Sequence, residues 1–283
     1  MKEALKWVFK ITLIVLAFYL VFKKVTLDEI RAAWAELHAI WLVPAFILYN
    51  ISQFISTFRL LQLLHAVGVQ IKYLTNLTLY YKAMFYGLFL PGGVSGDAYK
   101  VIYLQKKSES SYKTLITATL LDRVNGLTML LSIAVSLLLQ KIELFHDYIP
   151  LSSSWIFIIL LTGWLLYIIL HLRLFPVFNK VLLRISFLSL TIQLIQLLSF
   201  CCILYGFSIA PEQWLLYGIL FYTGSVLAAL PLSINGLGIR EWVLVTGSTL
   251  LVLDSAKAFS ASLVFTMISA ICALIGGIIK VRD

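Results

Sequence analysis

Long apolar segments separated by short polar ones make up nearly the whole chain. A transmembrane helix needs roughly 20 mostly apolar residues, and many of these segments reach or approach that length. We interpret them as membrane helices, over Trp7–Phe22, Trp41–Phe58, Leu74–Leu90, Thr114–Leu139, Trp155–Leu170, Phe187–Phe207, Trp214–Leu230, Trp242–Leu253 and Ala258–Val281. The pattern predicts an all-α, polytopic integral membrane helical bundle.

One segment, residues 23–40, has a different pattern. Its apolar residues recur at helical spacing with charged residues between them, at Leu27, Ile30, Ala33, Trp34 and Leu37. This pattern is typical of an amphipathic helix lying in the membrane interface. No linker rich in Pro, Gly or Ser divides the chain, so residues 1–283 are predicted to form a single transmembrane domain.

Composition agrees with a membrane protein. The 283 residues are 61% hydrophobic and 12% charged, with a mean hydropathy of +0.97, whereas a soluble domain carries about 25% charged residues. Little sequence is left for a soluble catalytic module. The net charge of +9 comes from cations beside or within apolar segments, which argues against nucleic acid as a partner.

Basic residues in short loops mark the cytoplasmic side of a membrane protein. By this rule both termini are cytoplasmic, as are three polar segments, namely Arg59–Lys72, Lys100–Lys113 and His171–Arg184. The loops around Glu143–Pro150 and Pro211–Gln213 are poor in Lys and Arg and are predicted to lie outside. We therefore expect a multi-pass protein of the cell (inner) membrane.

This topology constrains two segments that begin and end on one side. Leu74–Tyr99 lies between two inside loops and is too short to cross twice, so it should enter from the cytoplasm and return. Trp214–Leu253 should enter from the outside and return. The prediction is about six full spans plus two oppositely inserted re-entrant hairpins, with eight spans as the alternative.

Each predicted hairpin turns at a proline-glycine break. The first break, Leu90–Lys100, reads LPGGVSGDAYK, and the second, Leu230–Glu241, reads LPLSINGLGIRE. Non-helical backbone at membrane depth is tolerated only where protein or water surrounds it, and paired interrupted helices point to a transporter's binding site. The breaks therefore predict a cavity or a tightly packed core.

Charged residues follow both breaks and also occur early in the span Thr114–Leu139. Each charge near the bilayer centre costs on the order of 2.5–3.5 kcal/mol, so we expect these groups to meet one another or a polar ligand. The predicted substrate-binding residues are Gly92, Gly93, Gly96, Asp97, Lys100, Asp122, Arg123, Asn235, Gly236, Arg240 and Glu241. Lys100, Arg123 and Arg240 would supply the positive charge, balanced by the three carboxylates.

Other readings of the polar residues remain open. Intramembrane charge pairs can be purely structural, and Lys82 and Arg59 are more readily explained as side chains that snorkel to the interface. Gln193 and Gln196 are expected to form interhelical hydrogen bonds. No phosphate-binding loop or metal-ligand spacing is present in the sequence, so no cofactor, no metal and no enzymatic activity are predicted.

Three stretches together resemble the lysylphosphatidylglycerol synthase/flippase transmembrane-domain family. They are the two breaks and the stretch from Asp122 to Leu127, DRVNGL, where Asp-Arg stands in place of the Glu-Arg usual in that family. The resemblance covers essentially the whole chain. It implies a polytopic domain that moves lipids or lipid-linked sugars between leaflets, and we expect this chain to lack the aminoacyl transferase domain of bifunctional members.

The function expected on these grounds is that of a lipid transporter or flippase, which moves an anionic or lipid-linked headgroup through a charged intramembrane cavity. Its partner would be a membrane phospholipid or a polyprenyl-linked lipid, with a partner enzyme supplying that lipid as one arrangement. Two alternatives stay open: a membrane-embedded lipid headgroup transferase, and a non-catalytic subunit of an envelope-glycan or lipid-modifying system.

Overall fold

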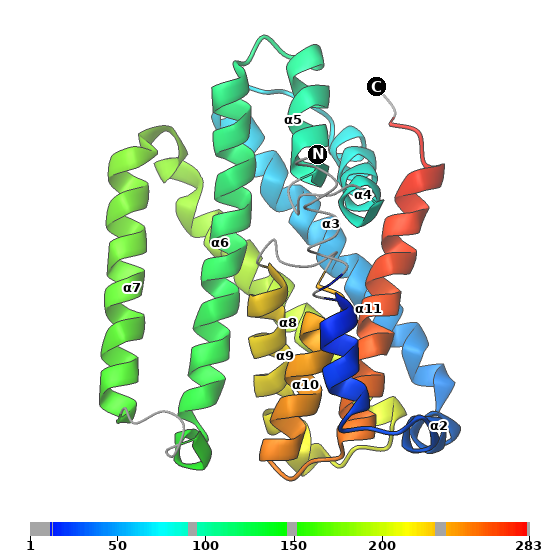
Figure 1. Ribbon diagram of the computed structural model, residues 1–283. Helices are drawn as coiled ribbons and strands as arrows, with labels where there is room; N and C mark the ends of the chain where they lie inside the picture. The colour runs from blue at the N-terminus through cyan, green and yellow to red at the C-terminus, as the bar shows by residue number, and fades with distance from the viewer. Residues whose placement is uncertain (1–11, 13, 90–94, 146–151, 230–235, 282–283) are drawn as a thin grey trace.

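The computed structural model describes residues 12, 14–89, 95–145, 152–229 and 236–281, and this part of the chain is helical without strands (Figure 1). The α-helices are α2 (Leu27–Ala35), α3 (Leu42–Ala66), α4 (Tyr73–Phe89), α5 (Ser95–Lys107), α6 (Tyr112–Leu139), α7 (Ser153–Leu174), α8 (Leu182–Gly206), α9 (Trp214–Ala229), α10 (Ile239–Leu250) and α11 (Ser255–Ile278). Residues 14–22 are also helical. Short 3-10 helices cover Ala39–Trp41, Ile142–Phe145, Pro176–Val181 and Pro211–Gln213.

Five helical segments of the described chain are long and apolar enough to cross a membrane. They are Ala39–Ala66, Tyr112–Leu139, Ser153–Leu174, Pro176–Gly206 and Ser255–Ile278. Of the first predicted span, Trp7–Phe22, the structure describes residues 12 and 14–22, which are helical. These helices confirm the predicted polytopic helical bundle.

Four of the shorter helices form two pairs at opposite ends of the bundle. Figure 1 shows α4 and α5 at its upper end and α9 and α10 at its lower end. At about 1.5 Å per residue, the 17 residues of α4 and the 16 of α9 extend about 26 and 24 Å, short of a hydrocarbon core of roughly 30 Å. These lengths fit two oppositely inserted hairpins better than eight full spans.

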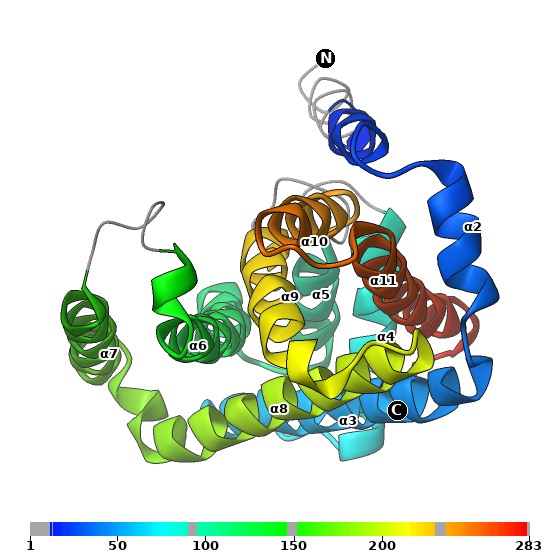
Figure 2. The same cartoon turned by 90° about the horizontal axis from the view of Figure 1, so that it is seen from below.

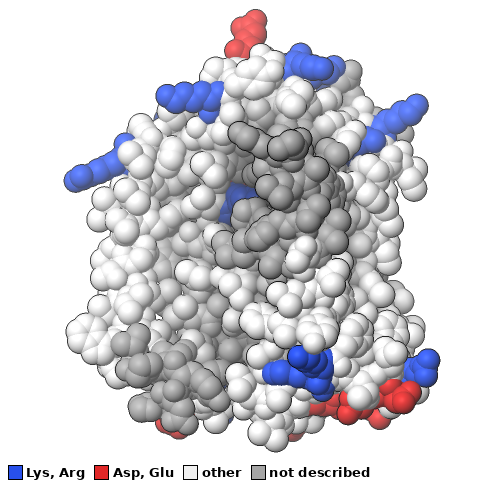
Figure 3. Space-filling model, viewed as in Figure 1, with Lys and Arg blue, Asp and Glu red and all other residues white. Residues whose placement is uncertain are grey.

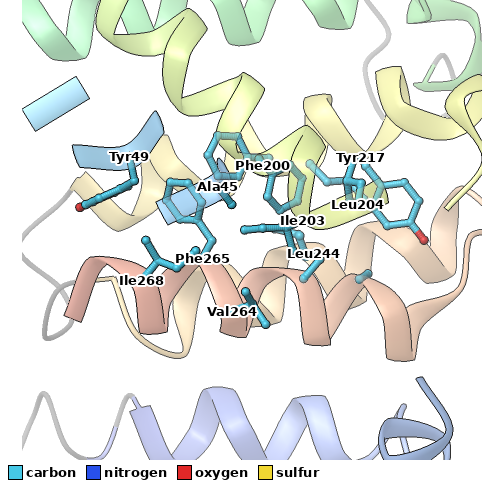
Figure 4. Close-up of a cluster of buried hydrophobic side chains, with 14 of the residues drawn as sticks. Ala45, Tyr49, Phe200, Ile203, Leu204, Tyr217, Leu244, Val264, Phe265 and Ile268 are labelled. Atoms are coloured by element: carbon cyan, nitrogen blue, oxygen red, sulfur yellow. The ribbon is translucent and has the colours of Figure 1, made fainter. Parts of the chain in front are cut away.

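Aromatic side chains pack the second hairpin against the long helices. Phe221 of α9 stacks on Phe200 of α8 with ring centroids 4.3 Å apart, and Phe265 of α11 meets the Phe221 ring edge-on at 4.9 Å. Figure 4 shows Phe200 and Phe265 close together in this cluster, with Tyr49 of α3 at one side. Because lipid is as apolar as these residues, close packing rather than water exclusion stabilises the contact.

The amphipathic segment predicted over residues 23–40 contains a shorter helix, α2. Thr26 and Glu29 form a capping box that starts α2, and the helix ends at Ala35. Figure 1 shows α2 crosswise to the long helices at the lower end of the bundle. Glu36, at its end, pairs with Lys257 of α11 at 2.6 Å; the hydrogen bond from Lys257 and its positive charge lower the pKa of Glu36. The interfacial position of residues 23–40 stays a prediction.

Helix α7 stands at the edge of the bundle. Figure 2, seen from below, shows it separated from the central helices, with α6 as its neighbour. Trp164 of α7 donates a hydrogen bond to Ser132 of α6 over 2.7 Å, whereas most of its apolar side chains are exposed. The central helices α3–α6 and α8–α11 therefore enclose the interior of the protein.

Candidate functional site

A cavity of about 430 Å³ lies where the inner ends of the two hairpins approach each other. Residues from α3, α4, α5, α6, α8, α9, α10 and α11 line it. Its charged lining residues are Arg59, Asp97, Lys100, Asp122, Arg123 and Arg240. Figure 3 shows Lys or Arg atoms inside a hollow at mid-height of the molecule. The described lining thus holds four cations and two carboxylates.

The first hairpin contributes a shared carboxylate. Asp97 of α5 pairs with Lys100 of the same helix at 3.2 Å and with Arg123 of α6 at 2.7 Å. The Lys100 ammonium also lies 4.2 Å from the ring centre of Tyr80 on α4. Because Asp97 and Lys100 are three residues apart, they share one face of α5. The charges after the first break are therefore held together and joined to α6.

A second ion pair joins α3 to α6. Arg59 Nε donates to Asp122 Oδ1 over 2.7 Å, and Arg59 Nη1 donates to Ser189 of α8 over 2.7 Å. Ser189 in turn forms a short hydrogen bond with Asn125. Only 7% of each charged side chain is exposed. Arg59 therefore belongs to the cavity wall. The expectation that its side chain snorkels to the interface is wrong.

The second hairpin contributes a cation that has no carboxylate partner among the described residues. Arg240 of α10 lines the cavity, and its Nη1 donates a long hydrogen bond of 3.4 Å to Thr266 of α11. Its guanidinium lies 5.2 Å from the ring centre of Phe265, and its Nε is buried without a hydrogen-bond partner. The Arg240 guanidinium is therefore less well satisfied than the other cations of the lining.

Glu241 lies next to Arg240 in sequence but not in the described cavity lining. Its carboxylate is fully buried and accepts hydrogen bonds from the Gly238 N–H (2.7 Å), Thr266 (2.8 Å) and Ser262 (3.1 Å). A carboxylate in the first turn that reaches back to the helix start stabilises that helix. The structure gives Glu241 this local role, apart from the other five predicted charges.

Two of the predicted glycines allow close backbone approach. A Cβ on Gly96 would collide with the backbone carbonyl of Ala83, where α5 crosses α4. Gly236 has a φ of 80°, in the left-handed region that favours glycine, and a Cβ there would be 2.6 Å from the Cβ of Ala228. Gly92, Gly93 and Asn235 lie outside the described residues.

Polar residues that the sequence interpretation did not assign to the site form another part of the wall. They are Tyr49, Gln53, Ser56, Tyr80, Gln193, Gln196, Ser225 and Ser269. On α3 the polar lining residues recur every three or four positions from Tyr49 to Arg59, a helical stripe visible in the sequence. Lys82, by contrast, donates to the Gly277 carbonyl over 3.4 Å and is not part of the lining.

The described part of the chain contains no group of three His, Cys, Asp or Glu side chains that could hold a metal ion. The charged lining of the cavity offers electrostatic interactions. Arginine presents planar, bidentate donors that match phosphate and carboxylate oxygens. The cavity is thus suited to an anionic polar group.

The helices and this cavity together define a multi-pass membrane protein with a polar interior. A family model described as "Lysylphosphatidylglycerol synthase TM region" matches residues 7–277, and the chain belongs to this family. Membership associates the protein with the handling of lipids or glycolipids. No curated protein sequence matches the chain.

Proposed function

We propose that the protein is a lipid flippase that moves an anionic or lipid-linked headgroup between leaflets through the cavity between its hairpins. The observation that carries the proposal is the lining of this cavity, which brings four cations and two carboxylates together from α3, α5, α6 and α10. A membrane phospholipid or a polyprenyl-linked lipid would be the cargo.

The charge balance of the lining favours an anion. Arg59 and Asp122 satisfy each other, and Asp97 is shared by Lys100 and Arg123. An excess of positive charge is left, most clearly on Arg240. A buried charge without a partner is costly, so an entering phosphate or carboxylate would offset a cost that the empty cavity carries.

The position of the cavity also suits transport. Hairpins inserted from opposite ends, each too short to cross, would bring the inner ends of α4, α5, α9 and α10 toward the middle of the bundle (Figure 1). In transporters, binding sites of this kind lie near the bilayer midplane between structural repeats, and access alternates as one element moves against another. A headgroup bound here would be roughly equidistant from the two membrane surfaces.

The exposed charges support an orientation for the chain. The α5–α6 loop and the C-terminal end of α11 lie at one end of the bundle (Figure 1), and exposed cations gather there, including Lys106, Lys107, Lys113 and Lys280. By the rule that basic loops face the cytoplasm, we propose that this end is cytoplasmic in the cell (inner) membrane.

Purified protein reconstituted into liposomes with a fluorescent anionic lipid tests the proposal. We expect the labelled lipid to become accessible to a membrane-impermeant quencher from the opposite leaflet faster than in protein-free liposomes, with no chemical change. A modified lipid would instead support a headgroup transferase. Neither movement nor modification would contradict the flippase and favour a subunit of a larger system.

A further inference from the structure

The described carboxylates of the cavity are already occupied by protein cations. Asp122 receives the Arg59 guanidinium at 2.7 Å, and the two oxygens of Asp97 receive Lys100 and Arg123 separately. Glu241 is turned away into its own hydrogen bonds with α11 and Gly238. An amino group entering this cavity would find no described carboxylate unpaired, and it would add to an excess of positive charge.

Uncharged amides and hydroxyls form the wall beside these ion pairs. The side-chain amides of Gln53 and Gln196 both donate to Ser52 Oγ, at 3.1 and 3.3 Å, which places them side by side. Gln193 lies one helical turn before Gln196 on α8, where its Nε2 is 3.5 Å from the Gly126 carbonyl. Gly126 in turn lies against the Arg59 guanidinium. The amide wall is therefore continuous with the cationic one.

One buried acceptor of this wall, the side-chain oxygen of Gln193, has no hydrogen-bond donor among the described residues. The side-chain oxygen of Gln193 is buried with no hydrogen bond, although the residue lines the cavity and is only 7% exposed. A buried amide oxygen without a donor is costly. A hydroxyl group of a bound headgroup could donate a hydrogen bond to this oxygen without adding positive charge to the cavity.

We propose that the headgroup carried by this protein is a phosphate ester of a neutral, hydroxyl-bearing group and contains no amine. The inference rests on the proposed function and names its substrate class. The phosphate would lie beside Arg240, and the hydroxyls would lie against Gln193, Gln196 and Gln53. A glycerol headgroup and a sugar headgroup share this chemistry.

Equilibrium binding tests the headgroup separately from transport. Calorimetric titration of the purified protein would use four short-chain lipids: phosphatidylglycerol, a prenyl phosphoglucose, phosphatidylmethanol and lysylphosphatidylglycerol. Phosphatidylmethanol has the charge of phosphatidylglycerol without its hydroxyls. We expect one or both hydroxylated anions to bind about 10-fold more tightly than phosphatidylmethanol, and the stronger of the two identifies the source of the hydroxyls.

Three results would overturn the proposal: binding of the lysyl lipid at least as tight as that of phosphatidylglycerol, equal binding of all the anions, or no binding. The variant Gln193→Leu should reduce the preference for the hydroxylated anions over phosphatidylmethanol by about 3- to 10-fold. Gln140→Leu, on an exposed residue at the far end of α6, is the matched control. An unchanged preference in Gln193→Leu would also contradict the proposal.

The same lipids in the liposome assay keep the two proposals apart. Selective binding without movement between leaflets would contradict the flippase and leave the headgroup assignment intact. Movement of all anionic lipids at one rate, with no binding preference, would support the flippase and contradict the headgroup assignment.

Discussion

The two hairpins carry an acid and a base after a glycine-containing break, yet they use them differently. In the first hairpin Asp97 and Lys100 pair with each other at 3.2 Å and both line the cavity. In the second, Arg240 lines the cavity, whereas Glu241 is fully buried against Gly238 and α11. One hairpin is close to internally neutral at the cavity, and the other presents a cation.

Helix geometry explains the difference. Residues three apart lie on the same face of a helix, and adjacent residues do not. The acid and base of the first hairpin are three apart, whereas Arg240 and Glu241 are adjacent and point in different directions. Spacing, and not residue type, decides whether the acid and the base pair with each other or separate into a helix cap and a cation that lines the cavity.

The largest effect is expected from removing the cap of the second hairpin. Glu241→Ala leaves three buried donors without their acceptor, and we expect a loss of about 4 kcal/mol in the free energy of unfolding. Glu241→Gln retains an acceptor oxygen and should lose roughly half as much. Thermal unfolding in detergent measures both. If Glu241→Ala unfolds like the native protein but transports nothing, Glu241 acts on the ligand and is not a cap of α10.

The cation of the second hairpin should matter for transport and little for stability. Arg240→Ala removes charged hydrogen bonds to the headgroup, and we expect transport to fall about 100-fold. The free energy of unfolding should change by only about 1 kcal/mol, because no described carboxylate loses its partner. Arg123→Ala should also abolish transport without preventing membrane insertion. Normal transport by both variants would exclude the cationic cavity as the path.

The fold followed from the sequence because its signals are local. The lengths of the apolar segments predict the long helices α3, α6, α8 and α11. The shorter apolar segments beside the two breaks predict the hairpins. Loop charge predicts the membrane side from which each hairpin enters, and this orientation stays a prediction. Only the exact bounds differ: α3 continues to Ala66 instead of ending near Phe58, so Arg59 lies within the helix.

The site was predicted less completely because its pairing is not local. Five of the six predicted charges line the cavity, but the partner of Asp122 is Arg59, 63 residues away in sequence. No spacing rule links two residues on different helices. The sequence interpretation places Glu241 in the cavity as a counter-charge that follows the second break, whereas Glu241 is not in the described lining. It expects Gln193 in an interhelical hydrogen bond, and Gln193 also lines the cavity.

The glycines of the two hairpins offer a test of smaller effect. Gly96→Ala would force α5 away from the Ala83 carbonyl, and Gly236→Ala would add left-handed strain to a clash with Ala228. We expect each to lose about 2 kcal/mol in the free energy of unfolding. Gly87→Ala is the matched control, since nothing lies within 4 Å of a Cβ there, and it should be neutral or slightly stabilising. Equal effects at Gly96 and Gly87 would contradict the close approach of α4 and α5.

The smallest effect is expected for the lysine of the first hairpin that does not line the cavity. Lys82→Met loses one long hydrogen bond of 3.4 Å to the Gly277 carbonyl, and we expect a change of about 0.5 kcal/mol or less in the free energy of unfolding. Lys100→Met should lose about 2 kcal/mol, because it breaks a largely buried pair with Asp97 that Arg123 still partly compensates. The same two variants in liposomes distinguish membrane depth from cavity lining as the source of the transport effect. Transport should fall in Lys100→Met and stay unchanged in Lys82→Met. A comparable fall in both would mean that a charge on this hairpin matters for transport whether or not it lines the cavity.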